Sequence, residues 1–201
     1  MMPYYFAYGS NLDLNQMLRR CPTARPVEAI VLPNWRLVFR GVADIVPAQG
    51  CICRGGVFTI QPADLEALDR YEGFPSLYGR EDVGTYKGKP LMAYTITRGY
   101  ADRFNLPDGG YYQTIVRGYG DFDLDTDTLD EAISFTGKRL REQLQRNRVP
   151  QQRGRAKRSP GPQAGPVVDD PEERGFWDYL NEDVEVNENM YVGYRAKPKR
   201  R

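Results

Sequence analysis

Short stretches in the first hundred residues alternate apolar and polar side chains, which is the period expected of half-buried strands. The alternation is plainest at Trp35, Leu37 and Phe39. Lys87-Gly88-Lys89 separates two such stretches and predicts a hairpin. We therefore expect one sheet with strands at residues 4–7, 35–42, 52–60, 78–86 and 91–97, the third interrupted at Gly55-Gly56.

Apolar residues three and four positions apart predict helices between and after these strands. Asp13 with Gln16 resembles a capping box before one of them. Its apolar stripe is Leu14, Met17 and Leu18. A later helix has the stripe Tyr112, Ile115, Val116 and Tyr119, and Thr128 with Glu131 caps a last one along Leu129, Ile133, Thr136, Leu140 and Leu144.

A further helix is predicted between Pro62, a favourable first helical residue, and Gly73, which is placed to end it. Its inward face consists of Leu65, Leu68 and either Tyr71 or Glu72.

Apolar side chains become scarce after about residue 145. We expect the ordered domain, residues 1–145, to end there. Residues 146–168 are basic, with scarcely an apolar side chain, which predicts a disordered linker. Residues 169–201 form a charged aromatic tail. The linker is either solvated or a weak, salt-dependent binding segment for nucleic acid. In the tail, Phe176, Trp177 and Tyr179 are candidates for a lid over a pocket.

The amino-acid composition limits the residue types that could act in catalysis or bind a metal. The chain has 201 residues, a net charge of +1 and no histidine. A Ser-His or Cys-His pair is therefore excluded, and a general base must be a carboxylate, lysine, tyrosine or amine. Cys51 and Cys53 fit two small buried side chains better than a zinc site, so we expect no metal. Without a leader or apolar span in the sequence, we expect a cytoplasmic protein with no membrane contact.

A tight turn follows the first predicted strand. It consists of Tyr8, Gly9, Ser10, Asn11 and Leu12. Successive backbone N–H groups at such a junction point into one concavity, which suits a carboxylate or a developing oxyanion. A strand ending in a purely structural turn fits the same residues.

Glu72 is the second candidate for chemistry. Tyr71, Phe74 and Tyr78 are its apolar neighbours. Burial among them would raise the pKa of a carboxyl group towards neutrality, as a general base requires. The spacing also fits a solvated glutamate on the surface.

Together these segments resemble the gamma-glutamylcyclotransferase, or AIG2-like, superfamily, whose signature is a Tyr-Gly-Ser-Asn-Leu turn and a downstream Glu-Gly helix end. Here they stand at residues 8–12 and at Glu72-Gly73. Gly-Gly-Val-Phe at residues 55–58, Tyr78 and Tyr112 also match. The resemblance covers about residues 4–145.

The resemblance implies an α+β fold, a small mixed β-barrel flanked by helices, with the turn and Glu72 in one pocket. It implies cyclisation of a gamma-glutamyl group to 5-oxoproline, with release of an amine or amino acid and no cofactor. Glu72 would be the general acid and base. The substrate would contact Tyr8, Gly9, Ser10, Asn11, Leu12, Tyr78 and Tyr112.

The substrate class is more open. We favour a gamma-glutamyl amine or amino acid over glutathione, and the sequence leaves the oligomeric state open. The alternative function is a non-catalytic binding module that uses the turn and the basic segment to hold a partner.

Overall fold

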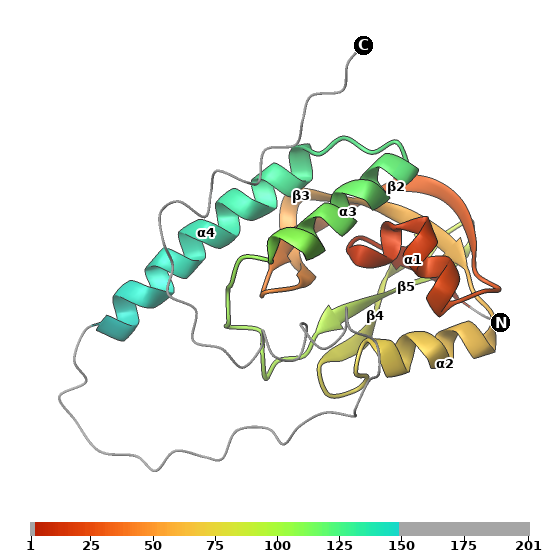
Figure 1. Cartoon of the computed structure of the whole chain (residues 1–201), viewed down its shortest axis with the longest axis horizontal. Coiled ribbons are helices and arrows are strands. Elements are labelled where there is room, and N and C mark those ends of the chain that lie inside the picture. The colour runs from red at the N-terminus through yellow and green to blue at the C-terminus, as the bar shows by residue number, and fades with distance from the viewer. Residues whose placement is uncertain (1–2, 149–201) are drawn as a thin grey trace.

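The computed structural model describes residues 3–148, and these residues form a five-stranded mixed sheet with helices packed against it (Figure 1). The α+β class expected from the sequence is confirmed. The tail, residues 169–201, and most of the predicted linker lie outside the described residues. The elements are β1 (Tyr4–Ala7), η1 (Ser10–Leu12), α1 (Leu14–Arg20), β2 (Arg25–Phe39), β3 (Ala43–Thr59), α2 (Pro62–Tyr71), β4 (Tyr78–Tyr86), β5 (Lys89–Ile96), α3 (Gly109–Asp121) and α4 (Asp127–Arg148).

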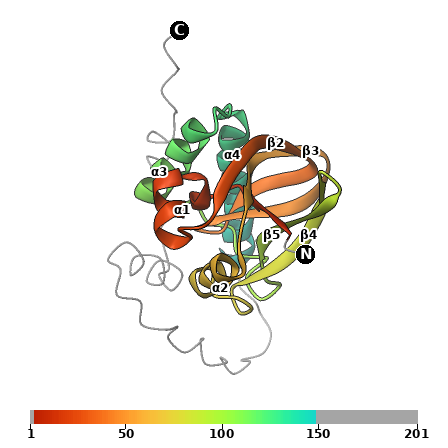
Figure 2. The ribbon, with the colours of Figure 1, turned by 90° about the vertical axis from the view of Figure 1, so that its right-hand side faces the viewer.

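The short strand β1 lies in the middle of the sheet, whose order is β2-β3-β1-β5-β4. It pairs antiparallel with β3 and parallel with β5. Figure 2 shows the sheet curling, and the Tyr86 hydroxyl donates to Glu28, so the edge strands β4 and β2 approach each other at that end. The chain leaving β1 is thus surrounded by other elements.

Strands β2 and β3 are longer than the sequence pattern predicts. The strand expected at residues 35–42 begins at Arg25 and ends at Phe39. The expected interruption at Gly55-Gly56 is wrong, because β3 runs through both residues. A Cβ on Gly55 would lie 2.3 Å from the Ala7 carbonyl oxygen, and one on Gly56 would lie 2.5 Å from the Phe122 ring. These glycines let neighbouring groups approach the strand.

The hairpin is confirmed, since Lys87 and Gly88 join β4 to β5 with φ angles of 48° and 73°, as a two-residue turn of the hairpin type requires. The Asp13 cap is also confirmed, because its carboxylate accepts from the Gln16 N–H at 2.9 Å. The Gln16 half of the expected capping box is absent, because the Asp13 N–H donates to the Ser10 carbonyl at 3.1 Å instead. Leu18, expected in the apolar stripe, is exposed instead. The short helix α1 buries Met17 and presents Leu18 to solvent.

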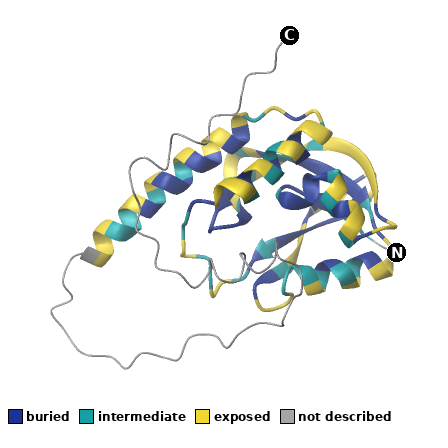
Figure 3. Ribbon diagram, viewed as in Figure 1, coloured by how far each residue is buried: buried dark blue, intermediate teal, exposed yellow. Residues whose placement is uncertain are grey.

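The last helix, α4, packs one side against β2, where the Phe39 N–H donates to the Thr136 hydroxyl. Buried and exposed residues alternate along it (Figure 3). Thr128 is not the cap that we expected: it lies inside the helix, with its hydroxyl 3.2 Å from that of Tyr119. The helix continues to Arg148, so residues 146–148 of the predicted linker are helical.

Candidate active site

The polypeptide leaves the central strand β1 at Tyr8 and turns at Gly9 into η1. The Leu12 N–H donates to the Gly9 carbonyl at 3.0 Å, and the Asp13 N–H to the Ser10 carbonyl at 3.1 Å. Within residues 3–148, the N–H groups of Ser10 and Asn11 have no acceptor. A turn of this kind therefore offers two backbone donors to an anion or oxyanion.

Glu72 is held at the end of α2 by a local motif. Gly73 has a φ of 64°, a conformation that glycine adopts without strain. The Phe74 N–H donates to the Asp69 carbonyl at 2.9 Å, which closes the helix as a Schellman motif. The predicted end of this helix is confirmed, and it turns the Glu72 side chain towards the strand-end turn.

Asn11 joins the two segments. Its Nδ2 atom lies 2.8 Å from Glu72 Oε1 and 2.8 Å from the Tyr5 hydroxyl oxygen. Its Oδ1 atom accepts from Arg20 Nη1 at 2.5 Å. The turn and the helix end, far apart in sequence, are therefore parts of one hydrogen-bonded cluster.

A pocket opens beside this cluster, and half of the residues that line it are tyrosines. The Tyr78 hydroxyl donates to the Ala43 carbonyl at 2.7 Å, and the Ala43 N–H donates to the Tyr111 hydroxyl at 3.1 Å. The lining residues are Tyr5, Tyr8, Gly9, Ser10, Asn11, Ala43, Glu72, Tyr78, Tyr94 and Tyr111.

Two residues expected at the substrate site are not among those that line this pocket. Tyr112 is buried in the core, with its ring edge-on to Phe39. Its neighbour Tyr111 faces the pocket instead, because successive residues of a helix point about 100° apart. Leu12 is fully buried below the turn.

Burial raises the pKa of Glu72 to about 7, against smaller lowering effects of the Arg20 charge and the Asn11 hydrogen bond. Burial also raises the pKa of Tyr111 to about 12, and those of Tyr8 and Tyr78 well above the usual tyrosine value. Near pH 7 these tyrosines are neutral, and Glu72 is poised between its acid and base forms.

Four residues of the site were missed by the sequence analysis: Tyr5, Arg20, Tyr94 and Tyr111. Tyr94 donates to Asp69 at 2.6 Å and its carbonyl accepts from the Tyr8 hydroxyl at 2.5 Å. The alternation along 91–97 would have placed Tyr94 on one face of the sheet, but no local signal identifies that face as the one towards Glu72.

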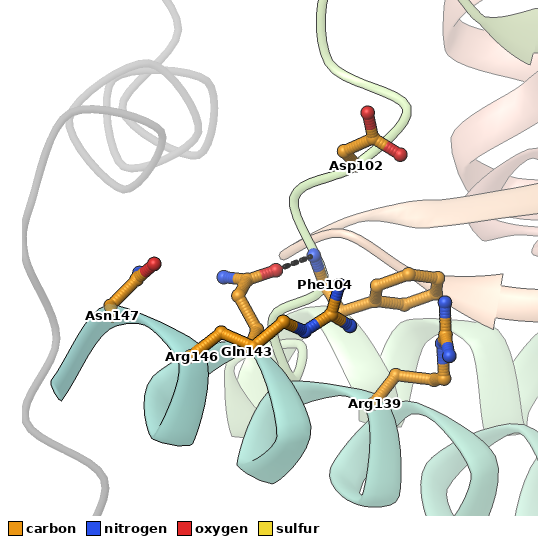
Figure 4. Close-up of a pocket in the computed structure, with 6 residues that line it drawn as sticks. All are labelled: Asp102, Phe104, Arg139, Gln143, Arg146 and Asn147. Atoms are coloured by element: carbon orange, nitrogen blue, oxygen red, sulfur yellow. Dashed lines mark hydrogen bonds between the residues drawn. The ribbon is translucent and has the colours of Figure 1, made fainter. Parts of the chain in front are cut away.

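A larger hollow lies elsewhere, between α4 and the loop before α3 (Figure 4). Its volume is about 300 Å³. Gln143 accepts there from the Phe104 N–H at 3.2 Å, and the arginines Arg139 and Arg146 stand beside it. The carboxyl group among its lining residues, that of Asp102, belongs to an exposed residue, so the smaller pocket at Glu72 is the better candidate for catalysis.

Among residues 3–148, no group of three or more His, Cys, Asp or Glu side chains is arranged to hold a metal ion. No helix in this part of the chain is both long and apolar enough to cross a membrane.

Solved structures share this fold. A structure described as gamma-glutamyl cyclotransferase is 21% identical, covers 86% of this chain and 96% of its own, and superposes with a TM-score of 0.52. An uncharacterized protein, loc79017, from Homo sapiens is also 21% identical, with coverages of 85% and 96% and a TM-score of 0.51. YkqA from Bacillus subtilis is 23% identical over 69% of this chain and 54% of its own, with a TM-score of 0.50.

No curated protein matches the sequence closely enough to be counted as similar. The family model for gamma-glutamyl cyclotransferase, AIG2-like, matches residues 5–114, more than half of the chain. That range contains both the turn at residues 8–12 and Glu72. The chain therefore belongs to the gamma-glutamyl cyclotransferase, AIG2-like family.

Proposed function

We propose that the protein cyclises the gamma-glutamyl group of a small molecule to 5-oxoproline and releases an amine or amino acid. The observation that carries this proposal is the Glu72 carboxyl group, whose pKa is about 7 and which is hydrogen-bonded to the turn that follows β1. A carboxylate of this kind both accepts and returns a proton near neutral pH.

The substrate supplies its own nucleophile. Its α-amine attacks the γ-carbonyl carbon, a C–N bond forms, and a five-membered ring closes. The γ-amide C–N bond then breaks, and the proton lost by the attacking amine passes through Glu72 to the leaving amine. Binding the substrate with its α-amine close to its γ-carbonyl removes much of the entropy cost of ring closure.

The turn supplies the complementary donors. The N–H groups of Ser10 and Asn11 face no acceptor within residues 3–148, so they are available to the substrate carboxylate or to the oxyanion. The neutral hydroxyls of Tyr8 and Tyr78 donate hydrogen bonds to backbone carbonyls, and the two side chains form part of the pocket wall. The space between these groups is small, about 30 Å³, so we expect the side chains that line it to shift when a glutamyl group enters.

The test is release of 5-oxoproline from gamma-glutamyl amino acids, gamma-glutamyl-lysine isopeptide and glutathione. We expect turnover with the first two substrate classes. Glu72→Gln should lose this turnover while its circular dichroism spectrum shows that the fold is retained. Glu66→Gln is the matched control, because Glu66 is an exposed residue of the same helix. Full turnover by Glu72→Gln would reject the assigned base.

A chain that ends at Arg148 separates this proposal from the binding-module alternative. Because the site is built within residues 5–111, we expect this shortened chain to keep full turnover. Loss of turnover on shortening, with the fold intact, would assign a functional role to residues 149–201.

A further inference from the structure

Arg20 ends α1, and its guanidinium group is half-buried between two parts of the site. Nη1 lies 2.5 Å from Asn11 Oδ1 and 3.5 Å from the Ser10 hydroxyl oxygen. The guanidinium carbon lies 3.3 Å from the centre of the Tyr71 ring. Arg20 is thus held by a hydrogen bond on one side and a cation–π contact on the other.

This arrangement fixes the orientation of the Asn11 amide. An arginine side chain is a donor only, so the amide oxygen of Asn11 must face Arg20. The NH2 group then faces the opposite way, where it has two acceptors, Glu72 Oε1 and the Tyr5 hydroxyl oxygen, both at 2.8 Å. A flipped amide would place its oxygen against the Glu72 carboxylate and its NH2 group against the guanidinium.

Arg20 also provides the positive charge at this site. Among the described residues, the titratable groups that interact with the Glu72 charge include Tyr5, Tyr8, Cys21, Tyr78, Tyr94 and Tyr111. Burial is the largest cause of the raised pKa of each, so all six are neutral near pH 7. Within the described part of the chain, the charge that shifts the pKa of Glu72 is that of Arg20, which lowers it.

We propose that Arg20 is a positioning residue for the cyclisation: it holds the Asn11 amide so that its NH2 group donates to Glu72, and it keeps a positive charge beside that carboxylate. This inference rests on the proposed function of Glu72. Arg20 acts through Asn11 and does not need to touch the substrate. Its charge favours the base form of Glu72, which accepts the proton of the attacking amine.

The experiment uses the full chain with Arg20→Met, which removes the charge and the donors. Arg20→Lys retains the charge, and Arg19→Met is the control, because Arg19 is the exposed neighbour on the same helix. The Glu72 carboxyl group is titrated by carbon-13 NMR, and kcat/KM for 5-oxoproline release is followed from pH 5 to pH 9.

In Arg20→Met we expect the Glu72 pKa to rise by about one unit, since an opposite charge nearby lowers a carboxyl pKa by about that much or more. The acid limb of the pH profile should move to higher pH with it, and kcat/KM at pH 7 should fall about fivefold, because a smaller fraction of Glu72 is then in its base form. Arg20→Lys should recover part of both, and Arg19→Met should match the wild type.

An unchanged Glu72 titration and pH profile in folded Arg20→Met would overturn the inference, even if kcat fell at every pH. If Arg20→Met does not fold, Arg20→Gln removes the same charge with a polar side chain, and the same shift is expected. If the wild type releases no 5-oxoproline, the proposed function fails. The NMR titration still decides whether Arg20 controls Glu72.

Discussion

Asn11 Nδ2 lies 2.8 Å from Glu72 Oε1, although the two residues are 61 positions apart in the sequence. The hydrogen bond links the turn after the central strand to the end of α2. It also gives the half-buried Glu72 carboxylate a hydrogen-bond donor in place of the water that is lost on burial. The site depends on this link, because neither residue has a local reason to face the other.

Asn11→Leu removes the link while keeping a side chain of similar size. Hydrogen bonds to charged groups are worth about 1.5–3 kcal/mol, so we expect kcat/KM to fall roughly 10- to 150-fold. The pKa of Glu72 should also rise, since the Asn11 hydrogen bond lowers it. Steady-state release of 5-oxoproline measures the loss. Asn15→Leu, an exposed position on α1, is the control and should have little effect.

Glu72 should make the protein less stable at high pH. Its folded pKa of about 7 is above the unfolded value of 4.5, so the folded state binds the proton more tightly between these values. The free energy of unfolding contributed by this group therefore falls as pH rises from about 4.5 to about 7 and stays low above it.

Glu72→Gln cannot titrate, so its gain in Tm over the wild type should be larger at pH 8 than at pH 5. Thermal unfolding at both values measures the difference. Glu66→Gln, on the exposed side of α2, should show no such pH dependence. A constant Tm difference for Glu72→Gln would mean that the carboxyl pKa is not raised in the folded protein.

Gly118 controls how closely α3 approaches the turn. A Cβ there would lie 2.5 Å from the Asp13 nitrogen and the Leu12 carbonyl carbon, both backbone atoms. Overpacking typically costs about 1–3 kcal/mol, so Gly118→Ala should destabilise the protein by at least that much and raise KM. Gly120→Ala, two residues further along α3, meets nothing within 4 Å and should be neutral or slightly stabilising. Urea denaturation compares the two.

The Arg40–Asp44 ion pair supports the strand that carries Ala43. Its atoms are 2.7 Å apart, and the two side chains are 5% and 3% exposed. Arg40→Leu leaves a buried, unpaired carboxylate and should cost about 3–5 kcal/mol of unfolding free energy. The double variant Arg40→Leu/Asp44→Leu should lose less than the sum of the single variants.

An ion pair on the surface is the comparison for this double-mutant cycle of Arg40 and Asp44. Arg139 and Glu142 are 3.0 Å apart but 41% and 37% exposed. Glu142→Gln should change the unfolding free energy by less than about 1 kcal/mol, because solvent screens exposed pairs. Additive losses in the buried cycle, with no coupling between Arg40 and Asp44, would contradict the prediction.

Several features with local causes were predicted correctly, although the expected cap at Thr128 was not. Pro62 and Gly73 marked the ends of α2, and Lys87 and Gly88 marked the hairpin, because backbone preferences of proline and glycine act over a few residues. Asp13 was recognised as a cap for the same reason. Features that depend on distant neighbours were predicted wrongly. Gly55 and Gly56 signal a break in isolation, but here they admit rings and a carbonyl group from other elements.

The residue pattern made the turn at residues 8–12 and Glu72 candidates, and it left a structural turn and a solvated glutamate open. The resemblance to a known family was needed to expect both in one pocket. The residue pattern could not choose between Tyr111 and Tyr112, since packing of α3 against the sheet decides which ring faces the pocket. Nor could it identify Arg20. It predicted that burial would raise the pKa of Glu72 towards neutrality, which agrees with the value of about 7, but it could not exclude a solvated glutamate. Burial and charge depend on distances in space, and those distances exist only once the chain has folded.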